Sequence, residues 1–123
     1  MAKYTDSLRG YAHPIHVRDS FTCRYCGLDG KASFDNWLAL TEDHLLPKGH
    51  PNRDDIEYRV SACHFCNTAD NQFFVQAEER GLKFDGLTQQ ELVAQRKPYV
   101  LRTRKNYRDF WARNVETGAM TNC

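Results

Sequence analysis

Four of the five cysteines in this 123-residue chain form two Cys-x-x-Cys pairs, Cys23 with Cys26 and Cys63 with Cys66. Their four thiolates match in number and softness the ligands of a closed tetrahedral zinc site. Gly27 follows the first pair and can supply the tight turn that brings two sulfurs together. A redox dithiol and four unrelated buried thiols are the alternatives. Because four thiolates leave no position for a reacting water, we expect this zinc to hold the fold and to take no part in chemistry.

The remaining residues around these pairs do not change this expectation. His64 lies inside the second pair, but the ligand set is complete without it, so we predict that it is not a ligand. Cys123 stands alone, and an odd number of cysteines does not fit a disulfide framework. A thiol redox protein would need a reactive pair beside a βαβ unit, which the sequence does not predict.

Asp43 and His44 stand side by side between the cysteine pairs and precede Leu-Leu-Pro. Adjacent side chains of a strand point to opposite faces, so the two can flank a substrate atom where the strand ends. Phosphodiester hydrolysis needs a base for the attacking water and a metal ion at the leaving oxygen. His44 suits the first role because imidazole titrates near neutrality, and Asp43 suits the second because hard cations prefer carboxylate oxygen. Taken alone, such a dipeptide is more often a surface histidine paired with its neighbouring acid.

The order of the motifs carries more information than the dipeptide. Cys-Arg-Tyr-Cys-Gly at 23–27 is followed by Asp-His-Leu-Leu-Pro at 43–47, a loop rich in Gly and Asn, and Cys-His-Phe-Cys-Asn at 63–67. In this order the sequence resembles the HNH endonucleases of the zinc-knuckle branch, over residues 25–71. The resemblance implies an α+β fold with a small ββα-metal core, similar to a treble clef and stapled by the four-cysteine zinc site.

The resemblance also assigns roles to matching residues. Asp43 resembles the metal-ligating acid, His44 the general base, and Asn67 the metal ligand at the start of the helix. Asn71, one helical turn beyond Asn67, can bind metal-bound water or a phosphate, and Asp70 can do so instead. The implied cofactors are the structural zinc and a catalytic divalent metal, Mg²⁺ or Mn²⁺, between which oxygen ligands select weakly.

The chain departs from the family pattern at the middle asparagine. The family has this residue five positions before the second cysteine pair, where the present chain has Tyr58. That asparagine usually ties down the loop behind the histidine, and Asn52 is the candidate substitute here. Cleavage is compatible with the change, but the loop geometry and the rate depend on it.

Basic residues concentrate near the C-terminus although the whole chain carries a formal charge of only +1. Residues 95–115 hold seven basic side chains and one acidic one, a local balance of +6. DNA is the usual substrate of the family, and clustered cations attract its phosphates. The predicted nucleic-acid-binding residues are Arg102, Arg104, Lys105 and Arg108. We expect Tyr107, Phe110 and Trp111 to pack on the domain while the arginines face phosphates.

The elements that must position these residues follow from local patterns. Residues 37–41 and 58–62 suit two short strands, and the Gly, Pro, Asn and Asp residues of 48–55 predict a loop between them. Residues 67–80 suit a helix that Gly81 terminates.

A second helix start is predicted further along the chain. Residues 88–91 form a capping-box pattern, with Leu87 and Leu92 at the positions of a hydrophobic staple. Pro98 should interrupt that helix, after which residues 99–115 form a final one.

The length predicts a single HNH nuclease domain over residues 1–123. Its core covers about 20–81, helices are added at both ends, and a basic helical extension covers about 87–116. Pro14 argues against one uninterrupted N-terminal helix. Without an apolar run of membrane-spanning length or a secretory signal, we expect a cytoplasmic protein with no membrane partner. Monomer and homodimer both stay open, because one active site nicks one strand and double-strand cutting calls for a dimer or two events.

The predicted function is that of a metal-dependent endonuclease that hydrolyses phosphodiester bonds of DNA. The alternative is a non-catalytic treble-clef zinc module that binds nucleic acid or protein. It explains the cysteines and the basic helix equally well, but leaves the combination of Asp43, His44 and Asn67 to coincidence. Arginines that contact phosphates and bases look alike in a sequence, so the target stays open, as do restriction, phage, mobile-element and repair roles.

Overall fold

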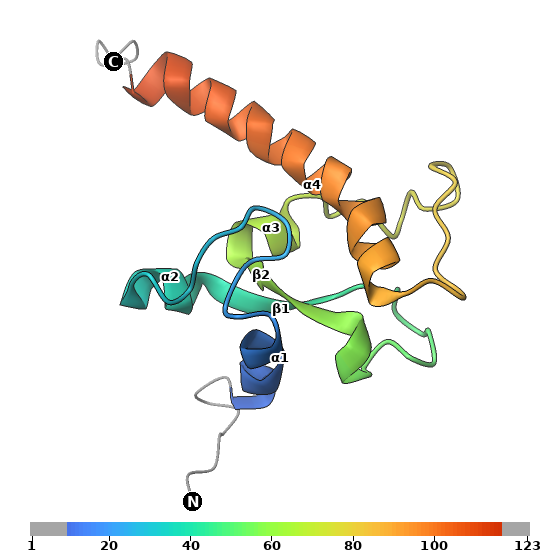
Figure 1. Ribbon diagram of the computed structural model, residues 1–123. Coiled ribbons are helices and arrows are strands. Elements are labelled where there is room, and N and C mark those ends of the chain that lie inside the picture. The colour runs from blue at the N-terminus through green and yellow to red at the C-terminus, as the bar shows by residue number, and fades with distance from the viewer. Residues whose placement is uncertain (1–9, 117–123) are drawn as a thin grey trace, which may run out of the picture.

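An antiparallel pair of five-residue strands carries the predicted site. Strand β1 (Leu40–His44) pairs with β2 (Arg59–Cys63), so that Leu40 lies opposite Cys63 and His44 opposite Arg59. Helix α3 (His64–Thr68) follows β2 directly, and helices surround this two-stranded sheet in a small α+β fold (Figure 1). The hairpin thus places the second cysteine pair at one end and His44 at the other.

The computed structural model describes residues 10–116. A short 3-10 helix (Gly10–Ala12) leads into α1 (His13–Arg18), whose first turn contains Pro14. Proline is tolerated there because the first N–H groups of a helix have no partner within it. Helix α1 packs against β2, and the His16 imidazole hydrogen-bonds the Ser61 hydroxyl at 2.7 Å.

The predicted strand over 37–41 is wrong, because residues 34–39 form helix α2 (Phe34–Ala39) and the strand begins at Leu40. Ser33 caps this helix, since its hydroxyl accepts the Asn36 backbone N–H at 3.0 Å. The cap therefore favours a helix in the first part of the apolar segment 37–41, and pairing with β2 makes the remaining residues a strand. The second predicted strand, 58–62, lies one residue later as β2.

The helix predicted over 67–80 is also wrong. Helix α3 ends at Thr68, and residues 69–81 form a succession of turns. The Asp70 carboxylate accepts the Gln72 backbone N–H at 3.2 Å and pairs with Arg80 at 2.5 Å. Side-chain bonds of this kind offer the backbone an alternative to the helical ladder.

Gly81, which was predicted to end that helix, closes the last of these turns instead. Gly81 has a φ of +69°, and its N–H donates to the Glu78 carbonyl at 3.1 Å. The Leu82 N–H donates to the Ala77 carbonyl at 2.9 Å. This pair of bonds is a Schellman motif, which requires the left-handed residue that glycine supplies without steric cost.

Helix α4 (Gln89–Trp111) begins at the predicted capping box of 88–91. It continues through Pro98, so the predicted interruption is wrong, and the helix bends instead (Figure 1). Proline removes one backbone hydrogen bond, but burial of Leu92 before it and Val100 after it holds both halves on the core. Within residues 10–116, no helix is both long and apolar enough to cross a lipid bilayer.

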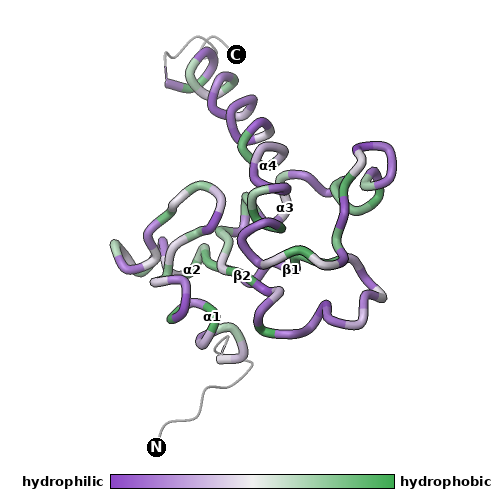
Figure 2. Tube along the Cα trace, turned by 45° about the vertical axis from the view of Figure 1, so that its right-hand side comes forward, coloured by the Kyte–Doolittle hydropathy of each residue, from purple (hydrophilic) through white to green (hydrophobic). Residues whose placement is uncertain are grey.

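The first half of α4 belongs to the core, whereas the second half extends away from the other elements (Figures 1 and 2). The predicted packing of its aromatic residues on the domain is wrong. Tyr107 is 65% exposed, Phe110 57% and Trp111 41%. The buried cluster contains residues of the first cysteine loop, the segment after β1, β2, α3 and α4: Cys23, Tyr25, Leu45, Leu46, Val60, Ala62, Cys63, Cys66, Leu92, Val93 and Val100.

Candidate functional site

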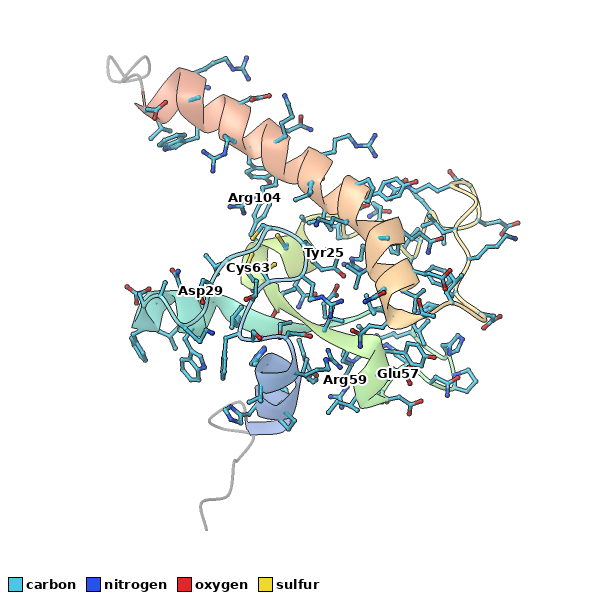
Figure 3. All side chains as sticks on the ribbon, viewed as in Figure 1. Tyr25, Asp29, Glu57, Arg59, Cys63 and Arg104 are labelled. Atoms are coloured by element: carbon cyan, nitrogen blue, oxygen red, sulfur yellow. The ribbon has the colours of Figure 1, made fainter. Side chains whose placement is uncertain are left out.

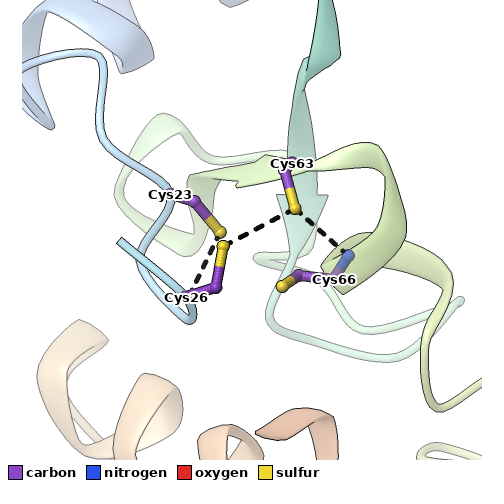
Figure 4. A group of neighbouring side chains, drawn as sticks. All are labelled: Cys23, Cys26, Cys63 and Cys66. Carbon is purple, nitrogen blue, oxygen red and sulfur yellow. Dashed lines mark hydrogen bonds between the residues drawn. The ribbon is translucent and has the colours of Figure 1, made fainter. Parts of the chain in front are cut away.

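Four cysteine side chains converge where the loop after α1 meets the junction of β2 and α3 (Figure 4). Their sulfurs all lie within 4.8 Å of one another, and the Cys26 and Cys63 sulfurs are 3.8 Å apart. A tetrahedral zinc ion with Zn–S bonds of about 2.3 Å separates its sulfurs by about 3.8 Å. All four cysteines are free thiols. The cluster therefore has the donor set and the spacing to hold a metal ion such as zinc.

Each cysteine pair sits on a turn whose backbone supports the sulfurs. The Cys26 N–H points to the Cys23 sulfur at 3.5 Å, and the Cys66 N–H to the Cys63 sulfur at 3.4 Å (Figure 4). Gly27 has a φ of +81° and closes the first turn, as its position after the pair predicts. Backbone N–H groups directed at sulfur stabilise the thiolate form that binds metal.

Crowding of the thiols changes their acidity. Hydrogen bonds from Cys63 and Cys66 lower the pKa of Cys23, while the bond to the Cys23 sulfur raises the pKa of Cys63 to about 11 and that of Cys66 still further. Ionisation of one thiol therefore makes ionisation of the others less favourable. A bound cation allows all four thiols to ionise. His64 is exposed and is not a member of the sulfur cluster.

A polar cavity of about 310 Å³ brings the predicted catalytic residues together. Asp43, His44, Asn67, Asn71 and Asp70 all line it. The strand end supplies the first two, and α3 and the turns after it supply the others. Side chains that were not predicted complete the lining: Glu42, Arg53, Thr68, Phe74 and Arg96.

His44 is the last residue of β1 and keeps a quarter of its side chain exposed. Its Nε2 atom lies 3.6 Å from Oδ1 of the exposed Asp54. Burial lowers the pKa of His44, and so do the positive charges of Arg53 and Arg59, while Asp54 opposes them. A neutral imidazole beside a water-accessible cavity can accept a proton, as a general base must.

Asp43 lines the same cavity but is only 3% exposed. The Tyr25 hydroxyl donates to its Oδ2 atom at 2.6 Å, and the Arg96 Nε lies 3.4 Å from that oxygen. Burial raises the pKa of Asp43 to about 6, against the attraction of Arg96 and the Tyr25 hydrogen bond. A cation held by Asp43 therefore shares the carboxylate with these two partners.

Arg96 is a component of the site that the sequence analysis missed. It is 4% exposed, donates to the Asn67 carbonyl at 3.2 Å, and lies 5.0 Å from the Phe73 ring centroid. Its Nε and Nη1 atoms have no hydrogen-bond partner among residues 10–116. In the sequence Arg96 is one of the basic residues of 95–115, and no local signal separates it from the exposed ones.

Asn67 is locked onto the neighbouring strand. Its amide nitrogen donates to the Thr41 hydroxyl at 2.9 Å and to the Glu42 carbonyl at 3.1 Å, which directs the amide oxygen away from β1. Asn71 is exposed and lines the cavity. Because α3 ends before Asn71, the helical spacing from Asn67 that we used to predict this position does not explain it. Asp70 faces the cavity while paired with Arg80.

The backbone of residue 58 ties down the chain behind the histidine. The Tyr58 carbonyl accepts the Leu45 N–H at 2.9 Å, immediately after His44. This bond does not depend on the type of side chain at 58, so the missing asparagine leaves it in place.

The predicted substitute, Asn52, acts within the loop itself. Its amide donates to Asp55 at 3.0 Å and its backbone N–H to the His50 ring at 3.1 Å. His50 in turn contacts Asp85 at 2.7 Å, which links the loop to the segment before α4. Asn52 thus stabilises the loop from within, through Asp55 and His50.

The sulfur cluster and the cavity give this chain two features to compare with known proteins. No family model, no curated protein and no solved structure matches this chain.

The predicted nucleic-acid-binding residues all lie on the second half of α4. Arg102 lies over the Tyr99 ring at 5.3 Å, and Arg104 extends toward α3, 5.9 Å from the Phe65 ring centroid (Figure 3). Lys105 pairs with Asp109 at 2.8 Å, and Arg108 is exposed. The helix therefore presents arginines beside aromatic rings.

Proposed function

We propose that the protein is a metal-dependent endonuclease of the HNH type, which hydrolyses phosphodiester bonds of DNA. The observation that carries this proposal is the meeting of His44, Asp43 and Asn67 in one polar cavity beside a β-hairpin and the helix that follows it. These are the residues to which the motif order assigns catalysis. A chance surface pair of acid and histidine would not bring the asparagine of a separate helix to the same cavity.

The cavity residues divide the chemistry between them. His44 removes a proton from the attacking water as its oxygen bonds to phosphorus, and the bond from phosphorus to the leaving oxygen breaks. Asp43 and Asn67 present the oxygens that would hold a divalent ion, Mg²⁺ or Mn²⁺, which stabilises negative charge on the leaving oxygen when bound. Tyr25 and Arg96 hold Asp43 in place.

The zinc that we assign to the four cysteines has a purely structural role. Four thiolates fill the tetrahedral shell, and the sulfurs join the loop after α1 to the end of β2. In this proposal, zinc fixes the hairpin relative to α3 and thereby sets the distance between His44 and Asn67.

One observation favours the alternative of a non-catalytic zinc module that binds nucleic acid or protein. The Asp43 carboxylate is buried and already bound by Tyr25 and Arg96, as a purely structural residue would be. Such a module would keep the cysteine cluster and the basic helix but would cleave nothing.

Plasmid cleavage separates the two functions. With Mg²⁺ or Mn²⁺ the protein should nick or linearise supercoiled DNA, and a chelator should stop the reaction before the protein loses its zinc. Asn67→Ala should need a higher metal concentration for half-maximal cleavage, because one oxygen ligand is missing. Absence of cleavage with every divalent metal, on both single- and double-stranded substrates, would replace the nuclease by the binding module.

Salt dependence tests the basic residues in the second half of α4. Replacing Arg102, Arg104 and Arg108 together with alanine should weaken DNA binding and reduce the slope of log affinity against log salt by about 0.9 for each phosphate that is no longer neutralised. Lys31→Ala is the matched control, since Lys31 is an exposed cation of the loop between the first cysteine pair and α2. An unchanged slope in the triple variant would show that these three arginines do not contact phosphates.

A further inference from the structure

Four residues of α4 form a continuous stripe along its second half. Arg104, Tyr107, Arg108 and Trp111 follow one another at spacings of three, one and three positions. Residues at i, i+3, i+4 and i+7 share one face of an α-helix. The stripe therefore alternates cationic and aromatic side chains on a single side of the helix.

The stripe borders a groove of about 390 Å³ whose other wall is Phe65 of α3. The Tyr107 and Phe65 rings meet edge to face at 5.0 Å, and the Arg104 guanidinium lies 5.9 Å from the Phe65 ring. These five residues define what we call the α4 groove: Phe65, Arg104, Tyr107, Arg108 and Trp111. Its volume falls at the low end of the range of about 300–1,000 Å³ typical of small-ligand sites.

The exposure of the aromatic residues is unusual for a helix face. Tyr107 and Trp111 remain 65% and 41% exposed, although such large rings normally dominate a core or an interface. Among the residues that line the groove, Phe65 is the one that does not belong to α4. The groove therefore offers exposed aromatic faces on which a flat ring can stack.

We propose that the α4 groove binds unpaired nucleotides of a single-stranded nucleic acid. Tyr107 and Trp111 stack on base faces, and Arg104 and Arg108 contact the flanking phosphates. The inference rests on the proposed function, because the ligand of the groove and the substrate of the proposed nuclease are the same class of polymer. It narrows that substrate to nucleic acid with an unpaired segment.

Charge selects this occupant over an apolar one. The groove contains two arginines, and residues 95–115 carry a local balance of +6. An apolar peptide would bury these guanidinium groups without an anion, which costs free energy, and a second copy of α4 would bring mostly cations against them. A nucleotide supplies both an apolar face for the rings and a negative charge for the arginines.

The aromatic rings select single strands over duplex. In a duplex the faces of the bases are stacked on one another, so a protein can reach only their edges and the phosphates. Aromatic side chains can stack only on bases that have left the helix. A groove with rings and arginines therefore favours a strand whose bases are unpaired.

The α4 groove and the catalytic cavity share helix α3. Phe65 faces the groove and Asn67 faces the cavity, and two positions along an α-helix turn about 200°. The two sites thus lie on opposite sides of one helix of five residues. A strand anchored in the groove is held next to the cavity where cleavage is proposed.

The inference is tested by measuring binding to a fluorescent single strand and to the corresponding duplex. The strand has about 12 nucleotides, which is within the length that one single-strand-binding domain covers. His44→Ala is present in every variant and divalent metal is left out, so that cleavage does not interfere with the binding measurement. Tyr107→Ala and Trp111→Ala should each weaken single-strand binding about fivefold or more, while duplex binding changes less than about twofold. Phe110→Ala is the matched control, because Phe110 is an exposed aromatic residue of the same helix outside the groove.

Tryptophan fluorescence gives a second measurement that a merely structural role would not affect. The chain has two tryptophans, so Trp37→Phe leaves Trp111 as the single emitter. An oligothymidylate that stacks on Trp111 should quench this emission in a saturable way, and Tyr107→Ala should shift the titration to higher concentration.

Each other outcome overturns the inference. Equal losses for single strand and duplex would make the groove a general phosphate-binding surface, and no loss in either would make it unrelated to nucleic acid. Self-association that Trp111→Ala abolishes without a change in single-strand binding would assign the groove to a second copy of the chain. The proposed nuclease function is tested separately. Plasmid cleavage can be absent while the binding results are as expected, and cleavage can occur while the groove variants bind like the wild type.

Discussion

Cys63→Ser is expected to release the metal from the cysteine cluster and to unfold the domain. Serine has nearly the same shape but offers a protonated, hard oxygen in place of a soft thiolate, so the zinc site loses a ligand. Structural zinc contributes about 10–16 kcal/mol in zinc-finger peptides, which is as large as the whole stability of a typical domain. Cys63 is also buried between β2 and α3, so the loss affects the elements that carry His44 and Asn67.

The measurement combines zinc content with thermal unfolding. The wild-type protein should carry one zinc per chain, and Cys63→Ser should carry none and show no cooperative transition. His64→Ala is the matched control, because His64 is the exposed neighbour of Cys63 and is not a member of the cluster, so zinc and melting temperature should stay unchanged. A native disulfide among the four cysteines, or a zinc-free variant that melts like the wild type, would contradict the structural metal site.

The second large effect is expected for His44→Ala, which should cleave DNA at least about 10²-fold more slowly, because a positioned general base contributes this much. The fold should survive, since the side chain is partly exposed and its ionic partner Asp54 is exposed at 3.6 Å. Zinc content and DNA binding should also stay as in the wild type. The loss is therefore assigned to proton transfer and not to structure.

Two further measurements separate the base from the metal ligands. Higher Mg²⁺ or Mn²⁺ should partly restore Asn67→Ala but not His44→Ala, whereas added imidazole should partly restore only His44→Ala, because it supplies the missing proton acceptor. His64→Ala again serves as the control and should cleave at the wild-type rate. If His44→Ala and the wild type cleave equally fast, the base is a different residue.

Asp43, the residue before the proposed base, is buried, so its substitution affects more than the proposed mechanism. Its carboxylate is stabilised by the Tyr25 hydroxyl and by Arg96, which reaches it from α4. A substitution of Asp43 would leave the Arg96 charge buried without its partner, so it would change stability as well as metal binding. Asn67 and His44 are therefore cleaner probes of the proposed mechanism.

The sequence by itself determined the features that depend on a few neighbouring residues. It identified the four cysteines that gather into one cluster, the capping box at 88–91, and Gly81 as a residue that ends a segment, although turns and not a helix precede it. Each of these is set by residue type and short spacing, because sulfur ligation, helix capping and a left-handed backbone act over a few positions. The order of the motifs also predicted that Asp43, His44 and Asn67 lie together, and all three line one cavity.

Only the tertiary structure decided where the longer segments go. Pairing of β1 with β2 sets the strand start at Leu40, and the ion pair between Asp70 and Arg80 accompanies turns where a helix was predicted. Contacts between segments far apart in the chain bury Arg96, while the second half of α4 extends away from the sheet and leaves Trp111 41% exposed. These outcomes depend on which surfaces meet, because burial and strand pairing outweigh the small local preferences that a sequence window contains.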